Sequence, residues 1–76
     1  PIRFFDDGVG AQWPVAWQLW LNQEQFTIRA LLDDQRMDLS IVYWEGLVEV
    51  LDQAGQRLGL GYMELTGYAD VTGKEK

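Results

Sequence analysis

Three side chains in the second half of the chain have the types and spacing of a small binding or acid–base site. Trp44 lies in an alternating stretch from Tyr43 to Leu51, and Tyr62 and Glu64 lie in a second one from Leu58 to Leu65. If the two stretches pair as neighbouring strands, Trp44 faces Glu64 and Tyr62 lies diagonal to Trp44. Such a cluster would hold a ligand hydroxyl in an apolar pocket, or supply an acid whose pKa is raised by burial.

A structural interpretation of the same carboxylate is also open. Glu64 would then accept hydrogen bonds from backbone N–H groups at the rim of a sheet, from the Trp44 indole or from the Tyr68 hydroxyl. The segment Thr66-Gly67-Tyr68 is typical of a corner that closes a strand, in which the tyrosine hydroxyl bonds back to the backbone. We expect Gly67 and Tyr68 to serve structure rather than catalysis.

A turn joins the two alternating stretches and fixes their expected register. Segment 52–55 has Asp52 at the first and Gly55 at the fourth position of a type I turn, which predicts a hairpin with Gly55 in the left-handed region. If Asp52 pairs with Gln56, Val50 lies opposite Leu58.

The same register assigns a role to two glycines. Gly46 would lie beneath Tyr62, and Gly61 would lie opposite Leu47. A glycine covered by a tyrosine on the neighbouring strand bends a sheet without loss of stability. We therefore expect Gly46 and Gly61 to curve the sheet.

Alternation elsewhere predicts further strands and almost no helix. All 76 residues are interpreted as one all-β domain, an antiparallel meander of four to five strands. Closure of a ligand-holding barrel takes about eight strands, so we expect a partial barrel that is completed by dimerisation or by a longer chain. The segments are a turn-rich lead-in at 1–12 with a short edge strand at 2–5, strands at 15–21 and 25–30, a polar turn at 22–24, a loop at 33–36 with one possible helical turn, a stretch at 39–42 that extends the third strand backward or forms a separate short piece, and a flexible tail at 70–76.

Composition excludes several classes of function. A net charge of −6 argues against binding to nucleic acid and to anionic membrane surfaces, and no apolar run is long enough to span a membrane. The chain has no His and no Cys, so a Ser-His-Asp triad and a zinc site are excluded, and we expect no metal and no cofactor. No charged and apolar leader is visible at the start, and the compartment stays open.

The clusters of acidic residues are better explained as solvated surface than as binding sites. Asp33, Asp34 and Asp38 could be imagined as a cation site, but their spacing matches no EF-hand loop, and a solvated connection explains them better. Glu45 and Glu49 share one strand face, and we expect both on the solvated outside of the barrel.

Tryptophans give a second possible binding surface. Trp13, Trp17 and Trp20 could form a stacking platform for a carbohydrate or a lipid. Trp17 falls on the apolar face of its strand and is expected in the core, whereas Trp20 falls on the alternate face. An exposed Trp20 would indicate a binding surface.

Several motifs together resemble a known family. Tyr43-Trp44-Glu45-Gly46 is followed by the block from Gly61 to Tyr68, and both resemble the end of the carotenoid 1,2-hydratase and AttH-like family, whose members are often labelled predicted secreted hydrolases. The segments 13–17 and 31–38 resemble preceding segments of the same family in the same order, so the resemblance covers about Trp13 to Ala69.

The resemblance implies a lipocalin-like fold and apolar ligands. Family members are similar to two consecutive β barrels, and the hydratase branch acts on carotenoids or other lipids. This chain resembles only the C-terminal portion. It also lacks histidine, so a catalytic role that the family assigns to histidine has no counterpart here. We therefore expect a non-catalytic module that binds an apolar small molecule or docks with another barrel; the alternative is part of a hydratase- or hydrolase-type enzyme in which Glu64 or an aspartate protonates a double bond.

Overall fold

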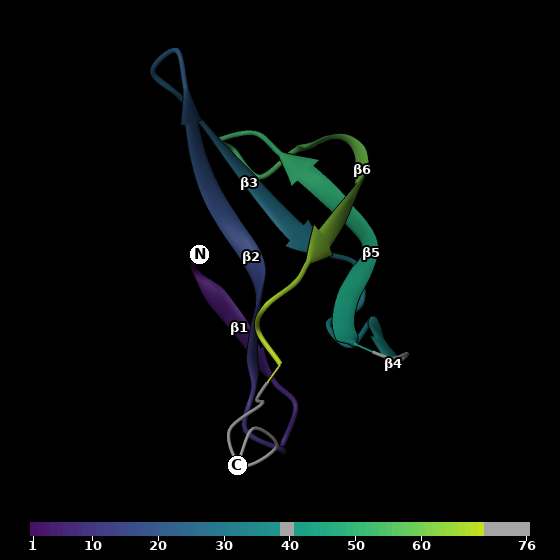
Figure 1. Cartoon of the computed structure of the whole chain (residues 1–76). Coiled ribbons are helices and arrows are strands. Elements are labelled where there is room, and N and C mark those ends of the chain that lie inside the picture. Colours follow the sequence, from purple (N-terminus) through teal and green to yellow (C-terminus); the bar gives the residue numbers. More distant parts are fainter. Residues whose placement is uncertain (39–40, 70–76) are drawn as a thin grey trace.

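A computed structural model of the chain describes residues 1–38 and 41–69. Within these residues six strands form one antiparallel sheet without helix, so the predicted all-β fold is confirmed (Figure 1). The sheet is open, because no pairing among the described residues joins its two outermost strands. The same part of the chain therefore offers no helix that could cross a membrane. The strands are β1 (Arg3–Asp6), β2 (Gln12–Leu21), β3 (Glu24–Ala30), β4 (Arg36–Asp38), β5 (Val42–Leu51) and β6 (Arg57–Leu65).

The strand count exceeds the predicted four to five. The added strand is β4, which has three residues and begins at the end of the predicted loop 33–36. The short edge strand expected near residues 2–5 is present as β1. Of the possible backward extension at 39–42, Val42 is the first residue of β5 and Ile41 lies outside the strand, whereas residues 39–40 and the expected flexible tail at 70–76 lie outside the described residues.

Strand β5 is the centre of the sheet. On one edge it pairs with β6 from Trp44 to Leu51. Its other edge is divided, because β3 pairs with residues 48–51 and β4 pairs with residues 42–44. Strands β2 and β1 continue the sheet beyond β3.

The side chain of Gln35 fills the gap between β3 and β4. Its Oε1 accepts a hydrogen bond from Leu47 N at 3.2 Å, and its Nε2 donates to the carbonyl oxygens of Leu32 at 2.8 Å and Leu47 at 3.3 Å. The Gln35 carbonyl also accepts from Glu45 N at 3.2 Å. Gln35 thus supplies hydrogen bonds to the stretch of β5 that pairs with neither β3 nor β4. Gly46 permits this, because a Cβ at Gly46 would lie 1.9 Å from Gln35 Oε1.

The two predicted hairpin turns form at the expected residues. Between β2 and β3 the two loop residues, Asn22 and Gln23, have φ angles of 51° and 70°, the left-handed geometry of a two-residue hairpin turn. Between β5 and β6, Asp52 Oδ1 accepts from the backbone N–H groups of Ala54 and Gln56, both at 2.9 Å. Gly55 has a φ of 87°, as predicted.

The expected register of β5 and β6 is wrong by one residue. Leu51 pairs with Arg57, but Val50 pairs with Gly59, so Leu58 is an extra residue in a β-bulge. From there on the faces of β6 are exchanged relative to the prediction. Trp44 therefore lies opposite Leu65 instead of Glu64.

The same bulge changes the environment of the glycines. Gly46 lies opposite Met63 and is not covered by Tyr62, which faces Leu47 instead, and Gly61 lies opposite Val48. The observed register places Met63 and Leu65 on the inner face and leaves Glu64 on the outer face. Burial of an unpaired carboxylate against Trp44 would be costly, and the bulge avoids this.

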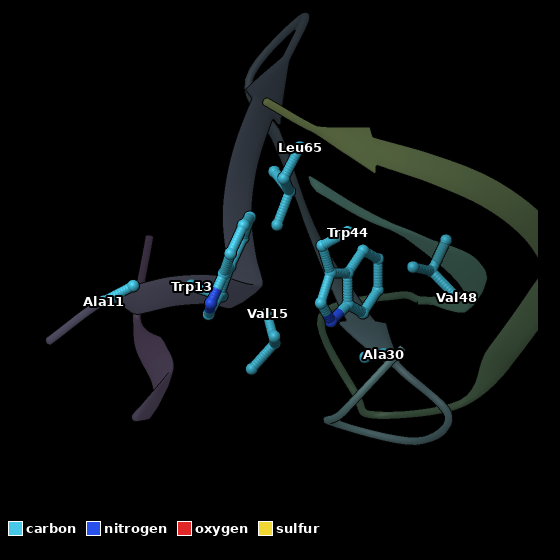
Figure 2. Packing of buried hydrophobic residues seen from close by; sticks show 7 residues of the cluster. All are labelled: Ala11, Trp13, Val15, Ala30, Trp44, Val48 and Leu65. Carbon is cyan, nitrogen blue, oxygen red and sulfur yellow. The ribbon is translucent and has the colours of Figure 1, made fainter. Parts of the chain in front are cut away.

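The core lies inside the curve of the sheet, around two tryptophans (Figure 2). Trp13 from β2 and Trp44 from β5 are both fully buried, and each indole N–H has a partner. Trp44 Nε1 donates to the carbonyl oxygen of Asp33 at 2.7 Å, and Trp13 Nε1 donates to Asp7 Oδ2 at 3.2 Å. The other buried members of the cluster are Ala11, Val15, Ala30, Val48 and Leu65.

Candidate functional site

A continuous apolar stripe follows the inner face of β2 and β3. Along β2, every second residue from Val15 through Trp17, Leu19 and Leu21 points to this face. Along β3, the stripe consists of Ala30, Ile28 and Phe26, and Leu19 lies directly opposite Phe26. The stripe begins in the core and ends in solvent: Val15 is buried, Leu19 is 37% exposed and Leu21 is 60% exposed.

The exposed end of the stripe results from unequal strand lengths. β5 pairs with β3 only from Thr27 to Ala30, whereas β2 and β3 remain paired as far as Leu21 and Glu24. The β2–β3 hairpin therefore extends beyond the rest of the sheet (Figure 1). Core residues such as Trp44 cover only the other end of the stripe.

Trp20 lies on the opposite face of this hairpin and is 64% exposed, as its place in the alternation predicts. Trp17, on the inner face, is half-buried and packs against the core, and its Nε1 donates to the Pro14 carbonyl oxygen at 3.0 Å. We use the term hairpin tip for Leu19, Trp20, Leu21 and Phe26. Apolar side chains on both faces of a projecting ribbon are typical of a binding surface.

The candidate cluster of Trp44, Tyr62 and Glu64 is divided between the two faces of the sheet. Trp44 is buried on the inner face, whereas Tyr62 is 64% exposed on the outer face. The Tyr62 hydroxyl donates to Glu45 Oε2 at 2.9 Å, and this hydrogen bond raises the pKa of Tyr62 above its ordinary value of 10.0. Glu64 lies on the same outer face, opposite Glu45. A ligand-binding role for these side chains stays a prediction.

The sequence interpretation missed a charged triad around Glu49. Glu49 is 8% exposed, so the expectation that it is solvated is wrong. Its Oε2 lies 2.5 Å from Arg29 Nε, and its Oε1 lies 2.9 Å from Arg57 Nε. The hydrogen bonds from Arg29 and then Arg57 hold the pKa of Glu49 below its ordinary value of 4.5. The signal in the sequence would have been Arg29, which faces Glu49 across β3 and β5.

Asp7 is a second residue that sequence reasoning missed. Its side chain is 4% exposed, and its Oδ1 accepts from the N–H groups of Val9 at 2.9 Å and Ala11 at 3.1 Å. Its Oδ2 accepts from the Trp13 indole and lies 3.7 Å from Arg36 Nη1. The hydrogen bond from Val9 is the largest of the contributions that lower the pKa of Asp7. Asp7 thus ties the lead-in to the core.

Asp7 also borders an open depression of about 420 Å³ beside β4. Arg36 lies in its wall and forms a two-point ion pair with Asp34, at 2.7 and 2.8 Å. These bonds lower the pKa of Asp34 and raise that of Arg36. Asp33 pairs instead with Arg3 at 2.5 Å. Residues 1–38 and 41–69 contain no group of three acidic side chains that could hold a metal ion.

A family model described as AttH-like matches residues 1–68. The chain belongs to the AttH-like family. The match includes the lead-in as well as the segments that carry the resemblance in the sequence. Comparison with curated proteins and comparison with solved structures gave no match.

In this AttH-like chain an aromatic contact fixes the segment that follows β6. The Tyr68 ring lies 6.1 Å from the Trp13 ring, with the two planes tilted by 48°. Gly67, just before it, has a φ of 84°, a conformation that favours glycine. The segment after β6 therefore crosses towards β2. A structural role for Gly67 and Tyr68 stays a prediction.

Proposed function

We propose that this AttH-like chain is a non-catalytic β module that binds an apolar chain along the inner stripe of β2 and β3. The observation that supports the proposal is the gradient of exposure along that stripe, from buried Val15 to Leu21 at 60%. A ligand would cover apolar surface that the sheet leaves in water, which is favourable by about 25 cal/mol per Å².

The shape of the stripe favours a narrow, extended ligand. It is two side chains wide, because β2 and β3 each contribute one row. From Trp17 to Leu21 it is roughly 13 Å long, since each strand residue advances about 3.3 Å. A fatty acyl chain or a polyene has the matching width and polarity. The exposed Trp20 on the opposite face would allow the same tip to dock against an apolar wall of another barrel instead.

Hydratase chemistry is less well supported by the charged groups. Protonation of an isolated double bond requires a carboxylic acid that is neutral near neutral pH. The carboxyl groups of Asp7 and Asp34, which border the depression beside β4, have lowered pKa values because N–H and guanidinium groups stabilise their anions. These two carboxylates stabilise the fold, and they carry no proton to donate near neutral pH.

The proposal is tested by titration with a fluorescent fatty acid while the tryptophan emission is followed. Binding should quench that emission, and Leu21→Asp should weaken binding by about tenfold or more, since about 1.4 kcal/mol corresponds to a factor of ten. Leu32→Asp is the control, because Leu32 is similarly exposed, at 64%, but lies in the loop after β3. Absence of quenching at saturating ligand, or equal weakening by both variants, would refute the proposal. If tryptophan emission instead shifts with protein concentration and the shift is lost in Leu21→Asp, docking with another barrel replaces ligand binding.

A further inference from the structure

The outer edge of β6 is available for pairing with another strand. β6 is nine residues long and pairs with β5, and no other strand in the described part of the chain pairs with it. Strand β1, at the opposite end of the sheet, has only four residues, and a short edge strand discourages edge pairing. β6 contains neither proline nor lysine. The two edges therefore differ in how they are protected.

The side chains on both faces of β6 leave room for another strand along its outer edge. On the outer face Leu58, Leu60 and Tyr62 are 57%, 58% and 64% exposed. Leu47 on β5, directly opposite Tyr62, is 50% exposed and extends this apolar surface. Towards the inner face, a Cβ on Gly59 would meet nothing within 4 Å. An added strand would thus gain apolar contacts without a clash at this glycine.

The charges of β6 make this edge complementary to itself. The strand begins with Arg57 and ends with Glu64 followed by Leu65. When a strand pairs antiparallel with a copy of itself, its start lies beside the end of the copy. With Gly61 at the centre of the pairing, Arg57 lies opposite Leu65 of the copy and one residue from its Glu64. The Arg57 guanidinium, which also pairs with Glu49 of its own chain, would therefore approach the Glu64 carboxylate of the copy.

We propose that the β6 edge is the interface of a two-fold symmetric dimer of this chain. Residues directly opposite in an antiparallel pair point to the same face, so one residue of β6 must lie opposite itself. The register that pairs the whole strand has Gly61, its middle residue, on the two-fold axis. Leu60 then faces Tyr62 of the second copy. Leu58 faces Glu64 of the second copy.

This interface is separate from the ligand stripe of the proposed function. The stripe lies on β2 and β3, whereas the dimer edge lies on β6, beyond β5. Dimerisation gives one continuous sheet of two curved halves and leaves both hairpin tips free. Either proposal can therefore fail without the other.

The first test is the mass of the chain in solution, measured by light scattering and sedimentation at micromolar concentration. We expect twice the monomer mass of 8.8 kDa. Leu60→Lys should weaken the dimer at least about tenfold, because lysine on an edge strand opposes pairing. Leu21→Lys, at a hairpin-tip residue of similar exposure, should leave it unchanged. A monomer at every concentration, or loss of the dimer in Leu21→Lys alone, would overturn the proposal.

Cross-linking tests the register. The chain contains no cysteine, so one introduced cysteine reports only on its own position. Residues directly opposite in an antiparallel pair have Cα atoms about 4.5–5.5 Å apart, within the range of a disulfide. Gly61→Cys should therefore form a covalent dimer on oxidation. Gly59→Cys should not, because its own copy lies four residues away, about 13 Å. Cross-linking of Gly59→Cys, or none in Gly61→Cys, would exclude this register.

Discussion

The contact between Gly46 and Gln35 gives the sharpest test of how this sheet is held together. Alanine at Gly46 would place its Cβ 1.9 Å from Oε1, 2.1 Å from Cδ and 2.5 Å from Nε2 of Gln35. These are overlaps with the end of a flexible side chain, so β5 keeps its course and the amide of Gln35 has to leave. Its departure breaks three hydrogen bonds of the Gln35 amide, one with Leu47 N and two with the carbonyl oxygens of Leu32 and Leu47.

The expected cost follows from those bonds. Each contributes about 0.5–1.5 kcal/mol net, and two of them are long and near solvent, so Gly46→Ala should lower the free energy of unfolding by about 2 kcal/mol. For a domain of this size that corresponds to a fall in Tm of roughly 8–16 °C. Gly59→Ala is the matched control on the neighbouring strand, because a Cβ at Gly59 meets nothing within 4 Å. It should be neutral or raise stability by up to about 1 kcal/mol.

Urea and thermal unfolding, followed by tryptophan emission and circular dichroism, measure these differences. The double variant Gln35→Ala/Gly46→Ala isolates the contact. Once the glutamine side chain is absent, Gly46→Ala has little left to displace, so the two changes should be non-additive by about 1–2 kcal/mol. If Gly46→Ala costs no more than Gly59→Ala, or if the costs of Gln35→Ala and Gly46→Ala simply add, Gln35 does not bridge β3 and β4 as described.

Two further predictions concern the charged triad and the core. The lowered pKa of Glu49 means that its ion pairs stabilise the fold above pH 4.5 and lose this contribution as the pH falls through the folded-state pKa. Glu49→Gln should therefore have a lower Tm at neutral pH than the control Glu24→Gln, and a smaller loss of Tm on acidification; equal pH profiles would contradict this. Trp44→Phe removes the buried N–H that donates to the backbone and some packing volume, so it should cost about 2 kcal/mol or more. Trp20→Phe, at an exposed position, should stay within about 0.5 kcal/mol in the same urea titration.

Local signals predict much of this fold. The alternation from Val15 to Leu21 assigns the two faces of β2, and it places Trp20 in solvent. The Asp52–Gly55 turn forms as its residue types require, since the Asp52 carboxylate and the left-handed glycine are properties of the segment itself. Such features need no knowledge of the rest of the chain.

The register of β5 and β6 could not be predicted in the same way. Its two possible faces carry either Leu60, Tyr62 and Glu64 or Gly61, Met63 and Leu65. The first set has more apolar bulk, so the pattern alone favours turning it inward. The cost of burying Glu64 outweighs that bulk, and one extra residue in the strand is enough to reverse the choice.

The charged contacts of Asp7 and Glu49 could not be predicted from the sequence for a different reason. Asp7 gains its burial from Trp13 and Arg36, and Glu49 gains its partners from two other strands. Both depend on pairings between distant segments, which the periodicity of a single stretch does not contain. The division of the expected cluster of Trp44, Tyr62 and Glu64 has the same origin, since it follows from the register.

The bulge at Leu58 makes the length of the β5–β6 connection part of the fold. Connections between strands usually tolerate insertions and deletions well. Deletion of Leu58 would spare the turn, yet it would rotate Met63 and Leu65 out to water and carry Glu64 towards Trp44. During evolution the residues beside this turn can therefore be substituted more freely than they can be inserted or deleted.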